Sequence, residues 1–234
     1  MRVNVLIGVG AQVKLARLLL RTDARTRSGD LRQFLEAAVT GGVDIVQIHE
    51  PGLEHEAELA ALRTAWDVAA RHRHLVMVSD SAALAADFGA DTVWLSQAPD
   101  TAGLADFRAG LGRFTRLGST ARDAEDLHRL LGDPSIDFLL VAAGSDLDLV
   151  TTAAEVAPVD ALDSKPWYAA GEFDADRLEQ AIAAGARRIA VGETLTLAED
   201  PHRMALRLSQ RLREVWATDP ELTRLTFAAL ADQS

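Results

Sequence analysis

The chain contains no cysteine among its 234 residues. Disulfides, cysteine-ligated zinc and thiol catalysis are therefore excluded, and the absence fits a reducing compartment, so we expect a cytoplasmic protein. Cations are also scarce, because 24 Lys and Arg face 35 Asp and Glu and the formal net charge is −11. Nucleic acids and anionic membranes are polyanions, so we expect neither as a partner.

Long apolar runs are missing as well. The apolar stretch 3–9 is too short to cross a bilayer, and its asparagine and glycine do not make a convincing secretion signal. The length of the chain is close to that of a (β/α)₈ barrel, typically about 250 residues. We therefore expect one domain with a single large core.

The segment 75–97, LVMVSDSAALAADFGADTVWLSQ, shows the unit from which the chain is built. Its first four residues are apolar, which is typical of a parallel strand buried on both faces. Ser79, Asp80 and Ser81 then supply capping oxygens for an alanine-rich helix that ends at Gly89. If such units close into a barrel, Asp80 lies at the C-terminal end of a strand, where these folds keep their chemistry.

Eight strand-helix units of this kind predict an α/β fold, a single (β/α)₈ (TIM) barrel over residues 16–218. A short N-terminal extension, residues 1–15, is expected as an edge strand or a cap, and residues 219–234 as an extra C-terminal helix. The apolar residues of this tail either cover the barrel or favour a homo-oligomer. The expected strands are residues 17–21, 44–49, 75–78, 92–95, 113–118, 138–142, 167–170 and 188–191.

Four stretches of the sequence carry a family resemblance. They are RTDARTRSGDLRQFLEAAVTGGVDIVQIHEPG, VSDSAALAADFGADTVWLSQ, GSTARDAEDL and KPWYAAGEFDADRLEQAIAAGARRIAVGETLTLAEDP. Together they resemble the thiamine phosphate synthase family of (β/α)₈ enzymes, which includes a thiazole tautomerase branch. The similarity covers roughly residues 16–215, in order.

The resemblance implies a specific transferase reaction in thiamine biosynthesis. Family enzymes join an aminopyrimidine methyl diphosphate to a thiazole phosphate and release diphosphate, with Mg²⁺ on the diphosphate. Such catalysis depends on cations that neutralise the leaving group and on backbone amides that hold the second phosphate. The implied partners are small phosphorylated thiamine precursors.

Carried over position by position, the resemblance implies a set of site residues. The implied catalytic residues are Gln47, His49, Gln97 and Ser119. The implied phosphate-binding residues are Ser119, Thr120, Gly171 and Gly192. The implied Mg²⁺ ligands are Asp80 and Asp100, although Asp100 stands one place later than the second acid of the family.

The same comparison reveals losses of charge and of glycine. The arginine and lysine of the family motif fall on His49 and Pro51, and the second acid falls on Pro99. The mobile loop after strand six, which carries a lysine in the family, is short here and contains none. Glu172 replaces the second glycine of the phosphate loop, and Glu193 adds another acid nearby.

Several of these residues admit a purely structural role. Asp80 serves either as a helix N-cap or as a metal ligand. His49 is either an acid, base or anion contact, or a polar residue in the space that an arginine leaves. Glu172 and Glu193 bind a cation or an amine, or they interact with helix dipoles. Trp94 is either packing at the barrel mouth or a stacking platform.

Two functions therefore remain open. The losses favour a divergent, possible pseudoenzyme member of the family, with a ligand-binding or regulatory role near thiamine metabolism. The alternative is an active thiamine phosphate synthase that needs Mg²⁺ and takes its phosphate contacts from other residues.

Overall fold

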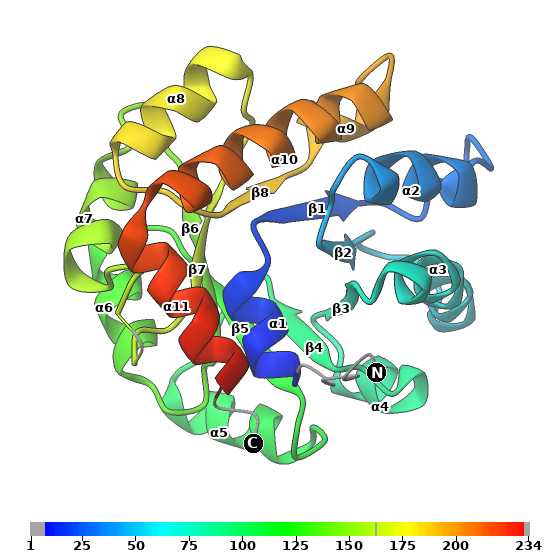
Figure 1. The fold of residues 1–234 in the computed structure, drawn as a ribbon. Helices are drawn as coiled ribbons and strands as arrows, with labels where there is room; N and C mark the ends of the chain where they lie inside the picture. Colours follow the sequence, from blue (N-terminus) through cyan, green and yellow to red (C-terminus); the bar gives the residue numbers. More distant parts are fainter. Residues whose placement is uncertain (1–7, 162, 232–234) are drawn as a thin grey trace.

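Eight parallel strands form a closed barrel in the computed structural model, and helices surround it (Figure 1). The structure describes residues 8–161 and 163–231. Each strand pairs with the next one along the chain, and β1 pairs with β8 to close the ring. The sequence-based expectation of a (β/α)₈ barrel is confirmed.

The strands and helices alternate along the chain. The strands are β1 (Leu18–Thr22), β2 (Ile45–Ile48), β3 (Leu75–Ser79), β4 (Thr92–Leu95), β5 (Arg116–Ala121), β6 (Phe138–Ala142), β7 (Trp167–Ala170) and β8 (Ile189–Val191). The helices are α1 (Val9–Leu15), α2 (Leu31–Thr40), α3 (His55–Ala69), α4 (Ala82–Phe88), α5 (Thr101–Ala109), α6 (Ala124–Gly132), α7 (Asp148–Val156), α8 (Ala175–Ala183), α9 (Glu193–Thr196), α10 (Pro201–Thr218) and α11 (Pro220–Ala231). A short 3₁₀ helix, η1 (Ala70–His72), follows α3.

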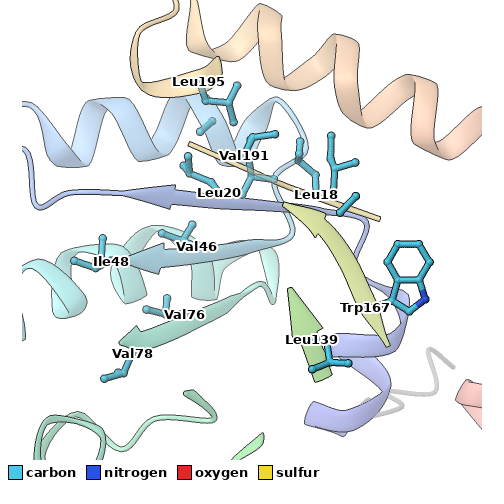
Figure 2. Close-up of a cluster of buried hydrophobic side chains, with 14 of the residues drawn as sticks. Leu18, Leu20, Val46, Ile48, Val76, Val78, Leu139, Trp167, Val191 and Leu195 are labelled. Atoms are coloured by element: carbon cyan, nitrogen blue, oxygen red, sulfur yellow. The ribbon is translucent and has the colours of Figure 1, made fainter. Parts of the chain in front are cut away.

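Side chains of each strand alternate between the two sides of the barrel wall. The inner cluster consists of Leu19, Ile45, Leu75, Met77, Trp94, Phe138, Leu140, Tyr168 and Ala190, with Val13 and Ala16 from the N-terminal segment. Residues of the opposite parity form the outer cluster and pack against the helices. Figure 2 shows part of that cluster, including Leu20, Val46 and Val76 from three adjacent strands.

Helix α1 covers the N-terminal ends of the strands, called the barrel bottom below. The hydroxyl of Tyr168 donates to the carbonyl of Val13 at 2.6 Å. The guanidinium of Arg188 donates to the carbonyl of Lys14 through Nε at 2.9 Å and Nη2 at 2.7 Å. Burial lowers the pKa of Arg188 to about 10, so it stays cationic at neutral pH. The helix is thus fastened to the barrel interior.

The expected edge strand at 3–9 falls mostly outside the described residues. Val9 itself begins helix α1.

The C-terminal tail forms helix α11, which lies beside α1 (Figure 1). Leu222 and Leu225 are buried with Trp216, and Leu15 of α1 packs against this group. The tail therefore covers its own barrel with these apolar residues, while Phe227 stays 69% exposed.

Two sequence-based expectations need correction. Strand β5 begins at Arg116 rather than at 113, because Thr115 closes a turn with its N–H on the carbonyl of Gly112 at 3.0 Å. As a result Ser119 and Thr120 lie within the strand. Helix α9, between β8 and α10, was not expected, because four residues are too few to show a helical period.

Within the described ranges 8–161 and 163–231, no helix has the length and apolarity needed to span a membrane.

Candidate functional site at the barrel top

The C-terminal ends of the strands, called the barrel top below, carry a linked group of polar side chains. In a (β/α)₈ barrel this end is where binding and catalytic residues gather. Arg21 and Gln47 are paired in register across β1 and β2, and Ser79 and Trp94 across β3 and β4. The period of two in each strand turns these residues toward the barrel interior.

Arg21 lies at the centre of this group. Its guanidinium sits over the ring of Trp94, 4.3 Å from the centroid, and its Nε donates to Oε1 of Gln47 over 3.4 Å. Burial lowers the pKa of Arg21, while the nearby Asp80 and Glu172 act in the opposite direction. An arginine that stacks on an indole gains cation–π energy, about 0.5–2 kcal/mol. Arg21 is thus a half-buried cation that the family motifs do not predict.

Gln47 connects this cation to the next strand. Its Nε2 donates to the hydroxyl of Ser79 at 3.0 Å, and that hydroxyl donates to the carbonyl of Ile48 at 2.8 Å. Gln47 is fully buried, so both ends of its amide need partners, and both have them. This hydrogen-bonded arrangement holds the amide in one orientation.

His49 lies beside the same tryptophan. Its ring meets Trp94 edge to face with centroids 5.4 Å apart, and its Nδ1 is 3.8 Å from Oδ2 of Asp80. Burial lowers the pKa of His49, the positive charge of Arg21 lowers it further, and Asp80 opposes both. The imidazole is therefore held mainly neutral near pH 7.

Asp80 does not cap helix α4. Ser81 is the N-cap, since its Oγ accepts from the N–H of Leu84 at 3.1 Å. Asp80 instead accepts from the N–H of Ser96 through Oδ1 at 2.6 Å, and its φ of 56° lies in the left-handed region. The carboxylate thereby ties the β3 loop to the β4 loop, and the capping interpretation of Asp80 is wrong.

Asp100, the second implied metal ligand, caps helix α5. Its Oδ1 accepts from the N–H of Gly103 at 2.8 Å. Over the described residues, no three His, Asp or Glu side chains converge in a way that would hold a metal ion. The oxygens Oδ1 of Asp80 and Oδ1 of Asp100 are already bonded to backbone amides. The Oδ2 atom of each carboxylate forms no such bond to an amide of the described residues, and one or two carboxylates together with substrate phosphates are a common Mg²⁺ arrangement.

Of the two residues expected to bind phosphate after strand five, only Thr120 faces the barrel interior. Its Oγ1 accepts from the indole Nε1–H of Trp94 at 3.1 Å. Ser119 has the parity of Leu117 and Ala121, which belong to the outer cluster. The Ser119 hydroxyl is fully buried and donates to the carbonyl of Leu95 at 3.0 Å. It therefore lies within the barrel wall and does not point toward the barrel interior.

The loops after β7 and β8 contain a carboxylate where barrels of this kind often bind phosphate, at the N-terminus of a short extra helix. Oε1 of Glu172 accepts from the N–H of Glu193 at 3.1 Å. Oε2 accepts from the N–H of Thr194 at 2.5 Å and from its hydroxyl at 2.6 Å. Gly192 adjoins the same carboxylate, since a Cβ built there would be 3.2 Å from Oε1. Glu172 therefore occupies the first amides of α9.

The remaining expected residues lie around the rim. Gly171, at the end of β7, donates its N–H to the carbonyl of Ala190 at 3.0 Å. Gln97 is exposed in the loop between β4 and α5. Glu50, which is not one of the implied site residues, accepts from the N–H of Ala24 at 3.0 Å and so holds the β1 loop.

Two further arginines on the rim were also missed. Arg122, just after β5, donates to the carbonyl of Ser96. Arg177 of α8 donates to the carbonyl of Ser145 at 2.8 Å and to that of Gly144. Both bind backbone carbonyls of neighbouring loops. The position of Arg122 could have been predicted from the sequence, because this residue directly follows the GSTA segment. Its hydrogen bond to Ser96 could not, because Ser96 lies in a different loop.

These features define a (β/α)₈ barrel of the type that gathers polar side chains at the C-terminal ends of its strands. The model of the family described as thiamine monophosphate synthase matches residues 18–195. The chain belongs to that family.

Individual relatives agree with this assignment. The chain is 36% identical to a thiamine-phosphate synthase of Mycobacterium marinum, over 86% of this chain and 97% of that protein. It is 38% identical to a thiamine-phosphate synthase of Thermobifida fusca, over 86% and 94% respectively. A solved structure, a thiamine phosphate pyrophosphorylase from Pyrococcus furiosus, shares the fold with a TM-score of 0.72 at 19% identity, covering 87% of this chain and 98% of that one.

Proposed function

We propose that this chain is a ligand-binding member of the thiamine monophosphate synthase family that does not carry out the diphosphate-releasing condensation. One observation carries the proposal: the carboxylate of Glu172 accepts both the N–H of Glu193 and the N–H of Thr194. A substrate phosphate seeking those amides meets a negative charge already bound there.

The electrostatic cost of sharing that position is large. Two unit charges of one sign about 4 Å apart repel by roughly 4 kcal/mol at a surface-like effective dielectric. A phosphate carries more than one charge, so the repulsion offsets most of what the amides contribute. The bonded oxygens of Asp80 and Asp100 support the same view, because they reduce the donors left for Mg²⁺.

The ligand we propose is a small molecule related to the thiamine precursors. Arg21 supplies a cation at the barrel top, and its contacts with the buried Trp94 and Gln47 hold it in place. Such a site suits a small molecule with one anionic group. We also propose a cytoplasmic location, supported by the lack of cysteine, and leave self-association through the exposed Phe227 of α11 as a further proposal.

A second candidate function is an active thiamine phosphate synthase. The names of the relatives at 36% and 38% identity favour it. Arg21, Arg122 and Arg177 also bring cations to the barrel top that the motif comparison does not contain. This function requires Asp80 and Glu172 to release their amide partners when substrates bind.

The test is a turnover assay with aminopyrimidine methyl diphosphate, thiazole phosphate and Mg²⁺, with the Thermobifida fusca relative assayed in parallel. We expect no thiamine phosphate above background from this chain. Turnover at a rate comparable with the relative contradicts the proposal and establishes the second candidate.

The proposal that the chain binds a small molecule is tested separately. Isothermal titration with each precursor, and with the thiazole lacking its phosphate, is expected to show binding of at least one compound, weakened by Arg21→Gln. Absence of binding by all three compounds contradicts it.

A further inference from the structure

An open cavity of about 400 Å³ lies at the barrel bottom, at the end opposite the site described above. Its walls come from the segments that lead into β1, β2 and β3, from the end of α2, and from α10. The lining residues include Arg17, Asp44, His72, His74, Ser209 and Arg213. The volume lies within the range of small-molecule sites, about 300–1,000 Å³.

Two guanidinium groups face this cavity without a carboxylate partner. In the described parts of the chain, neither Arg17 nor Arg213 forms an ion pair, although many other arginines do. Arg17 lies over the ring of Trp216 at 5.7 Å, and Arg213 donates to the hydroxyl of Ser209 at 2.6 Å and to its carbonyl at 3.1 Å. In a chain with a net charge of −11, this cavity brings together two arginines that form no ion pair among the described residues.

Asp44 is the acidic residue among the lining residues, and it is engaged with the backbone. Its Oδ2 accepts from the N–H of Arg17 at 2.7 Å and from the N–H of Leu18 at 3.0 Å. These bonds fix the carboxylate at the start of β1. The cavity therefore has two guanidinium charges against one carboxylate charge.

The two histidines add adaptable polar groups. The rings of His72 and His74 lie edge to face with centroids 5.7 Å apart. Nδ1 of His74 bonds the carbonyl of Val43, and a carbonyl only accepts, so Nδ1 carries the proton.

Glycine and serine keep the cavity wall in place. Gly42 has a φ of 109°, and a Cβ built there would lie 2.4 Å from the hydroxyl of Ser209. That hydroxyl donates to the carbonyl of Gly41 at 2.7 Å. The backbone of residues 41–42 therefore packs directly on α10. This contact places Arg213 beside Arg17 and Asp44, which precede the N-terminal ends of β1 and β2.

We propose that this cavity binds a phosphate group, either free phosphate or the phosphate of a small monoester. Guanidinium groups match the geometry of a phosphate and form charge-assisted hydrogen bonds with it. Arg17 and Arg213 supply the charge and the hydrogen-bond donors. The site is independent of the barrel top and of any turnover there.

The experiment is isothermal titration of the full chain with inorganic phosphate and, separately, with glycerol phosphate. We expect Arg213→Gln and Arg17→Gln each to weaken binding about tenfold or more, because each loses a charge-assisted contact. A matched control is Arg207→Gln, which removes the same charge from the exposed side of α10. This control variant is expected to bind both ligands like the unchanged chain.

The comparison of ligands identifies the source of the phosphate group. Tighter binding of the monoester assigns the cavity to a phosphorylated metabolite, whereas equal or weaker binding assigns it to free phosphate. Circular dichroism confirms that each variant is folded. The proposal is overturned if neither ligand binds at millimolar concentration, or if folded Arg213→Gln and Arg17→Gln bind like the unchanged chain.

Discussion

The guanidinium of Arg21 lies over the indole ring of Trp94, 4.3 Å from its centroid, in the middle of the barrel top. Arg21 points inward from β1 and Trp94 points inward from β4. The two strands between them, β2 and β3, carry Gln47 and Ser79. The pair brings a positive charge into contact with the same ring that His49 meets edge to face. The protonation of His49 is consequently coupled to the charge on Arg21.

Arg21→Gln is expected to raise the pKa of His49 toward its ordinary value. Burial lowers this pKa first and Arg21 second, so removal of the cation leaves burial and Asp80 acting in opposite directions. The measurement is a titration of the imidazole resonances by NMR. Arg122→Gln, at the rim, is the control and should leave the resonance of His49 unchanged. An identical pKa in Arg21→Gln would show that the two charges are not coupled.

His49 also predicts how stability changes with pH. Its pKa in the folded chain lies below the ordinary value of 6.5, so the unfolded chain binds a proton more readily as pH falls through 6.5. The contribution of His49 to the free energy of unfolding is therefore fully present above that value and decreases as pH falls toward the lowered pKa. Urea unfolding of the unchanged chain and of His49→Gln, over this pH window, measures the difference.

The control for that comparison is His202→Gln, since His202 is exposed on α10. The difference between the unchanged chain and His49→Gln should vary with pH, while the difference for His202→Gln should stay nearly constant. Parallel curves for all three proteins would refute the role of His49.

Glu172→Ala is expected to destabilise the chain by about 1–2 kcal/mol, since three hydrogen bonds to an ionised group are lost and water replaces them in part. The free amides of Glu193 and Thr194 should then respond to added inorganic phosphate by shifts of their NMR signals. The unchanged chain should show no such shifts.

The control for Glu172→Ala is Glu193→Ala, because the backbone N–H of residue 193 still bonds Glu172. If Glu193→Ala loses as much stability as Glu172→Ala, the hydrogen bonds of the Glu172 carboxylate do not account for the stability of α9.

Gly118→Ala is expected to cost about 1–3 kcal/mol, because the inner wall has no room for a methyl group. A Cβ at Gly118 would lie 2.2 Å from the ring of Phe138 on the neighbouring strand. Gly132→Ala is the control, since nothing lies within 4 Å of its Cβ position and alanine favours the helix. Thermal unfolding measures both. The double variant Gly118→Ala with Phe138→Leu should recover part of the loss.

The fold could be predicted because most strands have a continuous apolar run and several helices have a capping side chain, such as Ser81 for α4 and Asp100 for α5. The run 75–78 corresponds to β3 with one added residue, and the tail beginning at Pro220 is helical as expected. Strand β5 could not be placed correctly, because its inward positions include Gly118 and Thr120, which give no apolar signal. Its true register depends on the pairing of Ser119 with Leu95 and Leu139 in the neighbouring strands.

The candidate site could be predicted only in part. Gln47, His49 and Asp80 do lie together at the barrel top, as strand-end positions suggested. Arg21 was missed because an arginine within an apolar strand gives no sign of which way it points. The partner of Glu172 was missed for a different reason, since its amide donors lie 21 and 22 residues later, in a helix too short to be recognised.

The fastening of α1 to the barrel bottom has a consequence for the order of folding. The hydroxyl that binds Val13 comes from a residue 155 positions later, and the guanidinium that binds Lys14 from one 174 positions later. Helix α11, which packs beside α1, comes later still. On a ribosome, helix α1 therefore cannot dock until nearly the whole polypeptide has been synthesised. Such distant pairing makes this closure a late and slow event of folding.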